Sequence, residues 1–461
     1  MQNNTSISIG AIALIDKVDS KYKFFESVIG SLVGRTKHLK ESTKLFISNR
    51  LSKCVSVNKI SKLYPKETFD YLGFEESPKD RTLSRDLERI GRFNPFIIDK
   101  YQQLLKKNDL VSSKQFPDWS SSYFEGNKSK LGKLGYSRDS KPGKKQITFG
   151  VSTGINGIPT ALTIQKGNVC DKKHFRSTLK IVNKVLEKDS LLVFDCGANT
   201  KENKSKVLKL RYNYLTLKQK QRGPYKKYIE KYKESLKKIF YINDVKYKCV
   251  KIKENDGFKY IYFSKKAYKE QRRKRNKKFK KELKKNEKLL KKVQKGKIIS
   301  KYLYDEGEII LKGELEKKEI KNPYITGLEG FFILESSLDL SPYEILKLYK
   351  ERDRAEKLIR DMKEGTELRP IRHWSNEAII GYLTIVFLTN CIVQLTHFLS
   401  GNSVVKNVKL LKKYLENLTV TIVYDKSLFK FSILSNVSPE IRSILGDSVE
   451  KYEDKSLKLR W

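Results

Sequence analysis

The stretch Leu348–Lys363, LYKERDRAEKLIRDMK, decides how this chain of 461 residues is interpreted. Within it, Tyr349, Arg352, Glu356 and Lys363 follow one another at offsets of three, four and seven residues. At roughly 100° per residue of α-helix, their directions fall within about a 60° sector of one face. One carboxylate flanked by two cations and a phenol suits a metal-bound phosphate better than it suits a hydrophobic core.

The flanking sequence also favours a helix here. Ser341 is a candidate N-cap, Pro342 takes the first helical position, and Glu344 completes a capping box. An apolar stripe lies beside the polar sector, so the helix can pack while presenting its polar face. The stripe consists of Ile345, Leu348, Ala355, Ile359 and Met362. On charge pattern alone, a solvated helix face remains the alternative.

Two aspartates on predicted strands are the natural companions of Glu356. Metal-dependent phosphodiester cleavage needs two or three carboxylates from separate elements, which hold two Mg²⁺ ions about 3.5–4 Å apart. Asp118 lies in the β-rich run KQFPDWSSSYF, and Asp195 ends the apolar run SLLVFDCGA, which is typical of a strand buried on both faces. A carboxylate at the end of such a strand is costly unless a metal compensates. Taken singly, Asp118 is as well explained as a turn residue and Glu356 as a surface glutamate.

Several motifs resemble one known family. The spacing Y-x2-R-x3-E-x6-K resembles the signature of cut-and-paste insertion-sequence transposases of the DDE type. The segments FPDWSSSYFEG, GYSRDSKPGKKQITFGV and VFDCGANTKEN resemble further family motifs, and the likeness covers roughly residues 110–218 and 325–400. The chain departs from the pattern at Cys196, where an arginine is usual, and at Pro117, which cannot donate to a strand ladder.

The resemblance implies a ribonuclease-H-like fold, metal-dependent hydrolysis of phosphodiesters at transposon ends, and strand transfer to target DNA. It implies that two Mg²⁺ ions, with Mn²⁺ as a plausible substitute, are held by the three catalytic acids Asp118, Asp195 and Glu356. The residues that would contact terminal phosphates are Tyr349, Arg352 and Lys363. The implied partner is double-stranded DNA, both transposon ends and target. Paired cleavage at two ends implies a homodimer on that DNA.

The charge of the chain agrees with a polyanionic partner. Lys and Arg number 97 against 53 acidic residues, a net charge of +44. Nucleic acid is the first candidate partner and an anionic membrane the second. Lys265–Lys297 carries 18 basic and three acidic residues, and its Arg272, Arg273 and Arg275 are candidate DNA-binding residues. A long exposed helix and a solvated, partly disordered arm are both compatible with this composition.

The expected fold class is α/β, a ribonuclease-H-like core interrupted by an insertion and preceded by a small helical domain. Residues 1–110 form the helical domain, with possible DNA contacts, and residues 111–218 form the first part of the core in the order βββαβαβ. A β-rich and basic helical insertion domain occupies residues 219–325. Residues 326–400 form the second part of the core with the glutamate helix, and residues 401–461 form a C-terminal region.

Five scattered cysteines with no C-x2-C pair and no secretory leader predict a cytoplasmic, nucleoid-associated protein. Ala378–Leu399 is apolar enough to raise the question of a membrane span. Polar residues interrupt it, so we expect a buried helix and no membrane partner.

Two other functions remain open. A ribonuclease-H-like, structure-directed nuclease would cut branched or hybrid substrates without regard to inverted repeats. A non-catalytic DNA-binding protein descended from a transposase would gain nothing from clustered carboxylates. The chain has no G-x4-G-K-[ST] loop, which argues against a GTPase or kinase.

Overall fold

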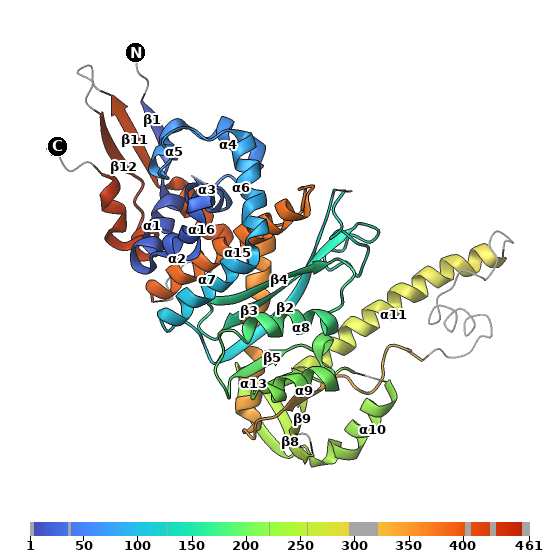
Figure 1. Ribbon diagram of the computed structural model, residues 1–461. Helices are drawn as coiled ribbons and strands as arrows, with labels where there is room; N and C mark the ends of the chain where they lie inside the picture. Colours follow the sequence, from blue (N-terminus) through green and yellow to red (C-terminus); the bar gives the residue numbers. More distant parts are fainter. Residues whose placement is uncertain are drawn as a thin grey trace. The chain divides into compact units, whose positions relative to one another are not determined.

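The protein is a mixed α/β structure, as predicted, and it divides into two units (Figure 1). The computed structural model describes residues 4–35, 38–126, 128–220, 222–255, 257–294, 321–401, 407–424 and 430–453. Unit 1 comprises Met1–Asn213 and Glu351–Trp461, and unit 2 comprises Tyr214–Lys350. Residues 295–297, the end of the predicted basic segment, lie outside the described residues.

The sheet of unit 1 has the strand order β4-β3-β2-β5. Its strands are β2 (Lys114–Tyr123), β3 (Gln146–Gly154), β4 (Pro159–Lys166) and β5 (Leu191–Phe194). Strands β2, β3 and β4 pair antiparallel, whereas β5 runs parallel to β2. Helix α8 (Asp171–Val182) packs on this sheet, and η2 (Cys196–Ala198) and α9 (Lys201–Lys209) follow β5. The order of these strands and α-helices agrees with the order predicted from the sequence for this part of the chain.

The helices of the N-terminal region surround the long helix α15 (Asn376–Leu399), which packs against α1, α3, α6 and α7. They are α1 (Gly10–Tyr22), α2 (Phe24–Val28), η1 (Gly30–Arg35), α3 (Leu39–Arg50), α4 (Val57–Leu63), α5 (Lys66–Tyr71), α6 (Asp80–Arg92) and α7 (Asn94–Lys107). By length and composition α15 could cross a membrane, but 89% of its apolar window is buried inside the protein. The prediction of a buried helix is therefore confirmed.

One hydrophobic core runs through unit 1. Side chains from the N-terminal helices, from β3 and β4, and from α15 belong to the same cluster. Two close approaches fix α6 against α15: a Cβ at Gly91 or Gly381 would lie within about 2 Å of the facing backbone. The sequence boundary at residue 110 therefore crosses a shared core.

A second, three-stranded sheet joins the two ends of unit 1, in the order β1-β11-β12. Strand β1 (Thr5–Ser8) pairs antiparallel with β11 (Thr419–Tyr424), which pairs with β12 (Lys430–Ser435). Figure 1 shows the blue β1 beside the red β11 and β12. The remaining C-terminal elements are α16 (Val408–Asn417), α17 (Pro439–Leu445) and η6 (Gly446–Tyr452).

Unit 2 is built on an antiparallel sheet of order β6-β10-β9-β8-β7. The strands are β6 (Asn213–Leu217), β7 (Lys238–Ile242), β8 (Val245–Glu254), β9 (Gly257–Ser264) and β10 (Phe331–Ser336). The helical elements are α10 (Arg222–Tyr232), η3 (Lys233–Ser235), α11 (Lys265–Gln294) and α13 (Pro342–Lys350). A small core of Tyr225, Ile229, Ile261 and Ile333 packs α10 on this sheet.

The prediction of one continuous helix through Leu348–Lys363 is wrong. Helix α13 begins with the predicted capping box: the Ser341 amide donates to Glu344 Oε2 over 3.0 Å, and the Glu344 amide donates to Ser341 Oγ over 3.3 Å. The helix ends at Lys350, and α14 (Asp353–Arg360) starts only after a turn. A π-helix, η5 (Asp361–Gly365), then follows.

The backbone hydrogen bonds change at the break. The amides of Arg354 and Ala355 donate to the carbonyls of Glu351 and Arg352, both over 3.0 Å, which are contacts to the third preceding residue instead of the fourth. The turn also coincides with the boundary between the units. Tyr349 lies on α13 in unit 2, and the four signature residues do not lie on one helix.

Candidate active site

Asp118 and Asp195 lie on neighbouring parallel strands. Lys114 pairs with Leu191 and Gln115 with Leu192, a constant offset of 77 residues. Continued three residues further, the same offset sets Asp118 opposite Asp195. The strand that carries Asp118 and the strand that precedes Asp195 are therefore neighbours in the sheet.

Pro117 explains why the ladder ends before the two aspartates. The amide of Leu191 donates to the Ser113 carbonyl over 2.8 Å, and parallel strands alternate such bonds every second residue. By that alternation the residue at position 117 should donate back to β5, but proline has no N–H. The paired residues accordingly stop at Gln115, so β2 and β5 are free to separate where the carboxylates stand.

Trp119 fixes the strand next to Asp118. Its indole Nε1–H donates to Thr178 Oγ1 on α8 over 3.0 Å, and its ring lies 5.7 Å from that of Phe175. Successive side chains of a strand point to opposite faces, so Asp118 faces away from α8. On that other face α14 packs against β2 and β3. The strand therefore presents Asp118 to the helix that carries Glu356.

Each aspartate accepts a hydrogen bond from the next residue along the chain. Asp118 Oδ1 accepts from the Trp119 amide over 3.0 Å, and Asp195 Oδ1 accepts from the Cys196 amide over 2.7 Å. These bonds hold one oxygen of each carboxylate close to the backbone of the next residue.

Two other carboxylates, those of Asp195 and Glu356, are close enough to Asp118 to affect its pKa. The pKa of Asp118 is raised to about 6, chiefly by burial and also by the charges of Asp195 and Glu356, while Arg352 and the Trp119 amide lower it. Only 17% of the Asp118 side chain is exposed, against 51% for Glu356. The site thus holds one poorly solvated carboxylate next to two others.

Arg352 lies between two of the carboxylates. Its Nη1 is 3.6 Å from Asp118 Oδ2, and its Nη2 forms an ion pair with Glu356 Oε1. The arginine side chain is only 15% exposed. Its charge also acts on the thiol of Cys196, the residue that follows Asp195. The guanidinium is therefore a central cation of the carboxylate cluster.

Cys196 adds no nucleophile to the site. Burial raises the pKa of its thiol to about 11, and the neighbouring Asp195 raises it as well. The thiol is therefore neutral at physiological pH, and a neutral thiol is a poor nucleophile.

Lys363 is buried within unit 1. Its Nζ lies 2.8 Å from Asp139 Oδ1, and Arg369 Nη1 lies 2.9 Å from the same oxygen. The Asp139 side chain is 1% exposed, and its Oδ2 accepts from the Tyr123 amide over 3.0 Å. Asp139 thus ties the loop after β2 to η5. Asp139 belongs to the GYSRDSKPG motif, whose sequence contains no indication of these two partners.

The three arginines of the basic helix have different surroundings. Arg273 is exposed, and so is Arg272, which stacks on the Tyr268 ring and hydrogen-bonds its hydroxyl. Arg275 instead forms an ion pair with Glu329, whose side chain is 1% exposed, and donates to Thr326 Oγ1 over 3.1 Å. Arg275 therefore holds α11 against the rest of unit 2.

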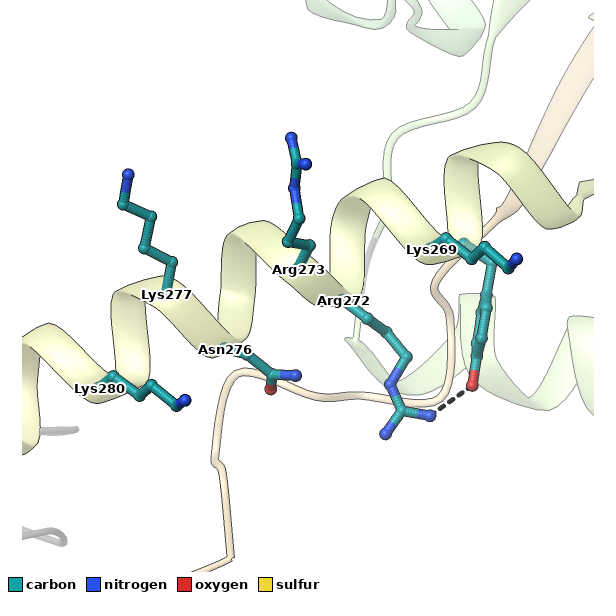
Figure 2. A pocket seen from close by; sticks show the side chains of 7 residues that line it. Lys269, Arg272, Arg273, Asn276, Lys277 and Lys280 are labelled. Atoms are coloured by element: carbon teal, nitrogen blue, oxygen red, sulfur yellow. Dashed lines mark hydrogen bonds between the residues drawn. The ribbon is translucent and has the colours of Figure 1, made fainter.

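Figure 2 shows Arg273 and Lys277 projecting to one side of α11, whereas Arg272, Asn276 and Lys280 point to the other. An open hollow of about 610 Å³ lies along this part of the helix. Its lining is Tyr268, Lys269, Arg272, Arg273, Asn276, Lys277 and Lys280. All its charged lining residues are cations.

The described residues include no group of three or more His, Cys, Asp or Glu side chains placed to hold a metal ion. The donor set nevertheless suits Mg²⁺ or Mn²⁺ in its chemistry, because these hard cations prefer carboxylate oxygens. Asp195 and Glu356 place further negative charge near Asp118, and a bound cation would offset it. In this structure Arg352 takes that place.

No protein-family model matches the chain, and no curated protein is similar to it. Among solved structures, the chain is similar to the cryo-EM structure of a piggyBac transposase synaptic complex with hairpin DNA. The TM-score is 0.44 and the identity 9%, over 99% of this chain and 89% of that chain. A likeness at this level establishes neither a shared fold nor a shared function.

Proposed function

We propose that this chain is a DDE-type transposase that cuts DNA at transposon ends and joins those ends to target DNA. One observation carries the proposal. Asp118 lies on β2, Asp195 directly follows the neighbouring parallel strand β5, and Arg352 pairs with both Asp118 and Glu356. Carboxylates brought together from two strands and a helix, in a basic chain, suit phosphodiester chemistry.

In this proposal Asp118, Asp195 and Glu356 hold two Mg²⁺ ions, which supply Lewis acidity and lower the pKa of water. The amides of Trp119 and Cys196 each donate to one oxygen of the preceding aspartate and so restrict its movement. Water adds to the phosphorus at the element end, and the bond to the 3′-oxygen breaks, leaving a 3′-hydroxyl and a 5′-phosphate. The 3′-hydroxyl then attacks a phosphodiester of the target, and no covalent enzyme intermediate is needed.

The rest of the chain supplies binding. Exposed cations of α11 repeat every four residues at positions 269, 273, 277, 281 and 285. At 1.5 Å per residue, neighbouring members of this row are about 6 Å apart along the helix axis, a spacing that can follow a nucleic-acid backbone. Tyr349 and Arg352 remain proposed contacts to terminal phosphates. A phosphate contact by Lys363 would require its pair with Asp139 to separate.

The test uses the full chain and DNA from either side of its reading frame, where inverted repeats are expected. Wild-type protein should nick this DNA at the repeat ends when Mg²⁺ is present. Asp195→Ala should bind the same DNA in a gel-shift assay without nicking it. Asp353→Ala is the matched control, because Asp353 is an exposed residue of α14 that forms an ion pair with Lys357 one turn further along the helix.

Three other results would count against the proposal. Cutting of branched or hybrid substrates regardless of the repeats would identify a structure-directed nuclease. Binding without any Mg²⁺-dependent cleavage would identify a DNA-binding protein. Undiminished nicking by Asp195→Ala would remove that residue from the chemistry.

A further inference from the structure

We propose that Arg352 is a resident cation of the carboxylate site, which a divalent metal ion must displace and which DNA phosphate draws away. The inference rests on the proposed function, since it concerns the same site. It differs from the role expected from the sequence, in which Arg352 contacts only phosphate. Arg352 instead has two alternating partners.

The first argument is the overlap of binding partners. Arg352 contacts Oδ2 of Asp118 and Oε1 of Glu356, and both residues are among the three acids proposed to bind metal. An ion about 2.1 Å from Asp118 Oδ2 would lie within about 6 Å of Arg352 Nη1, because that nitrogen is 3.6 Å from the oxygen. Like charges this close repel strongly in a poorly solvated site. Metal binding and the present position of Arg352 therefore oppose each other.

The second argument is the place of Arg352 in the chain. It lies in the turn between α13 and α14, and its backbone carbonyl accepts from Ala355 three residues on. Glu356, its ion-pair partner, is half-exposed, so one side of the cluster faces solvent. A rotation of the arginine side chain can move the guanidinium out of the cluster without unfolding α14. We expect this rotation when a phosphate offers a bidentate partner outside the site.

The consequence is positive coupling between DNA and metal. DNA that binds the guanidinium leaves the carboxylates without their cation and so favours metal loading. By linkage, metal that fills the site releases Arg352 for phosphate and tightens DNA binding by the same factor. Metal-dependent cutting is thereby restricted to the DNA-bound protein.

The test is a titration of the full chain with Mn²⁺ alone, followed by calorimetry or by the electron paramagnetic resonance signal of the free ion. We expect Arg352→Gln to bind Mn²⁺ about tenfold more tightly than wild type, because a close ion-pair competitor has been removed. Arg354→Gln is the matched control, since Arg354 is exposed and pairs with Glu351 at 2.7 Å. It should bind Mn²⁺ as wild type does. Arg352→Lys keeps a cation and should stay within about threefold of wild type.

A second titration adds double-stranded DNA. Wild-type protein should then bind Mn²⁺ about tenfold more tightly than without DNA, and Arg352→Gln should show little of this gain. Circular dichroism of each variant shows whether it is folded. Arg352→Gln that is folded and binds Mn²⁺ no better than wild type would overturn the inference.

The two proposals can fail separately. If Arg352→Gln does not tighten Mn²⁺ binding while wild type nicks end DNA and Asp195→Ala does not, the arginine inference fails and the proposed function stands. If Arg352→Gln tightens Mn²⁺ binding while no variant cuts DNA, the proposed function fails and the inference about the site stands.

Discussion

The raised pKa of Asp118 makes a quantitative prediction about stability and pH. Its pKa lies at about 6 in the folded protein, against an ordinary value of 3.8. The folded state thus binds the proton more tightly than the unfolded state does. Stability from this group is fully present below pH 3.8 and is lost as the pH rises through about 6.

The size of the effect follows from the shift. About two pKa units at 1.36 kcal/mol each give a total of about 3 kcal/mol, of which about 2 kcal/mol falls between pH 4.5 and 7.5. Asp118→Asn cannot titrate and should not lose this stability. The free energy of unfolding of Asp118→Asn, minus that of wild type, should therefore rise by about 2 kcal/mol from pH 4.5 to 7.5.

The assay is urea unfolding followed by tryptophan fluorescence, because Trp119 and Trp374 belong to unit 1 and Trp119 adjoins Asp118. Subtracting the free energy of unfolding of wild type at each pH cancels the contributions of the other titrating groups. Asp353→Asn, at an exposed position of α14, controls for the loss of one charge. A difference that stays flat across this range, or falls with rising pH, would refute the argument that Asp118 is poorly solvated.

Four further outcomes are expected. Asp139→Asn should lower the free energy of unfolding of unit 1 by about 3–5 kcal/mol in urea, since it leaves buried cations without their carboxylate; a loss under 1 kcal/mol would contradict this. Arg273→Ala and Lys277→Ala should each reduce the slope of log affinity against log salt for DNA by about one, and an unchanged slope would place DNA elsewhere. Arg275→Ala should lower the thermal midpoint of unit 2, because it strands a buried glutamate; a midpoint equal to wild type would argue against the anchoring role. Glu356→Gln should abolish Mg²⁺-dependent nicking of end DNA while binding persists, and undiminished nicking would exclude Glu356 from the site.

Local sequence pattern predicted the strands well, because each carries its own signal. The apolar run that ends in Asp195 and the β-rich run around Asp118 are confirmed as β5 and β2, and as neighbours. The capping box of Ser341 and Glu344 is confirmed too. In each case the residues that determine the strand or the helix start are close together in the sequence. The assignment of these elements to a ribonuclease-H-like fold, and the domain boundaries, remain predictions.

The failures are of a different kind. The turn at Glu351 and Arg352 contains no proline or glycine, so the sequence pattern of a helix continues through it and carries no local signal of a break. The pairing of β1 with β11 joins segments more than 400 residues apart, and no local pattern specifies it. The same holds for the pair of Asp139 with Lys363. Residue spacing showed neither where the helix breaks nor which distant group each residue would contact.

The proposed cleavage requires that three carboxylates bind divalent ions after Arg352 has moved away from them. The most direct measurement is an anomalous difference map from crystals of the protein with Mn²⁺ and an end-DNA duplex. We predict anomalous peaks within about 2.5 Å of carboxylate oxygens of Asp118 and Asp195, with Glu356 bound to one of the same ions and the Arg352 guanidinium on a DNA phosphate. Peaks away from these residues, or Arg352 still paired with Asp118 beside a bound ion, would contradict it.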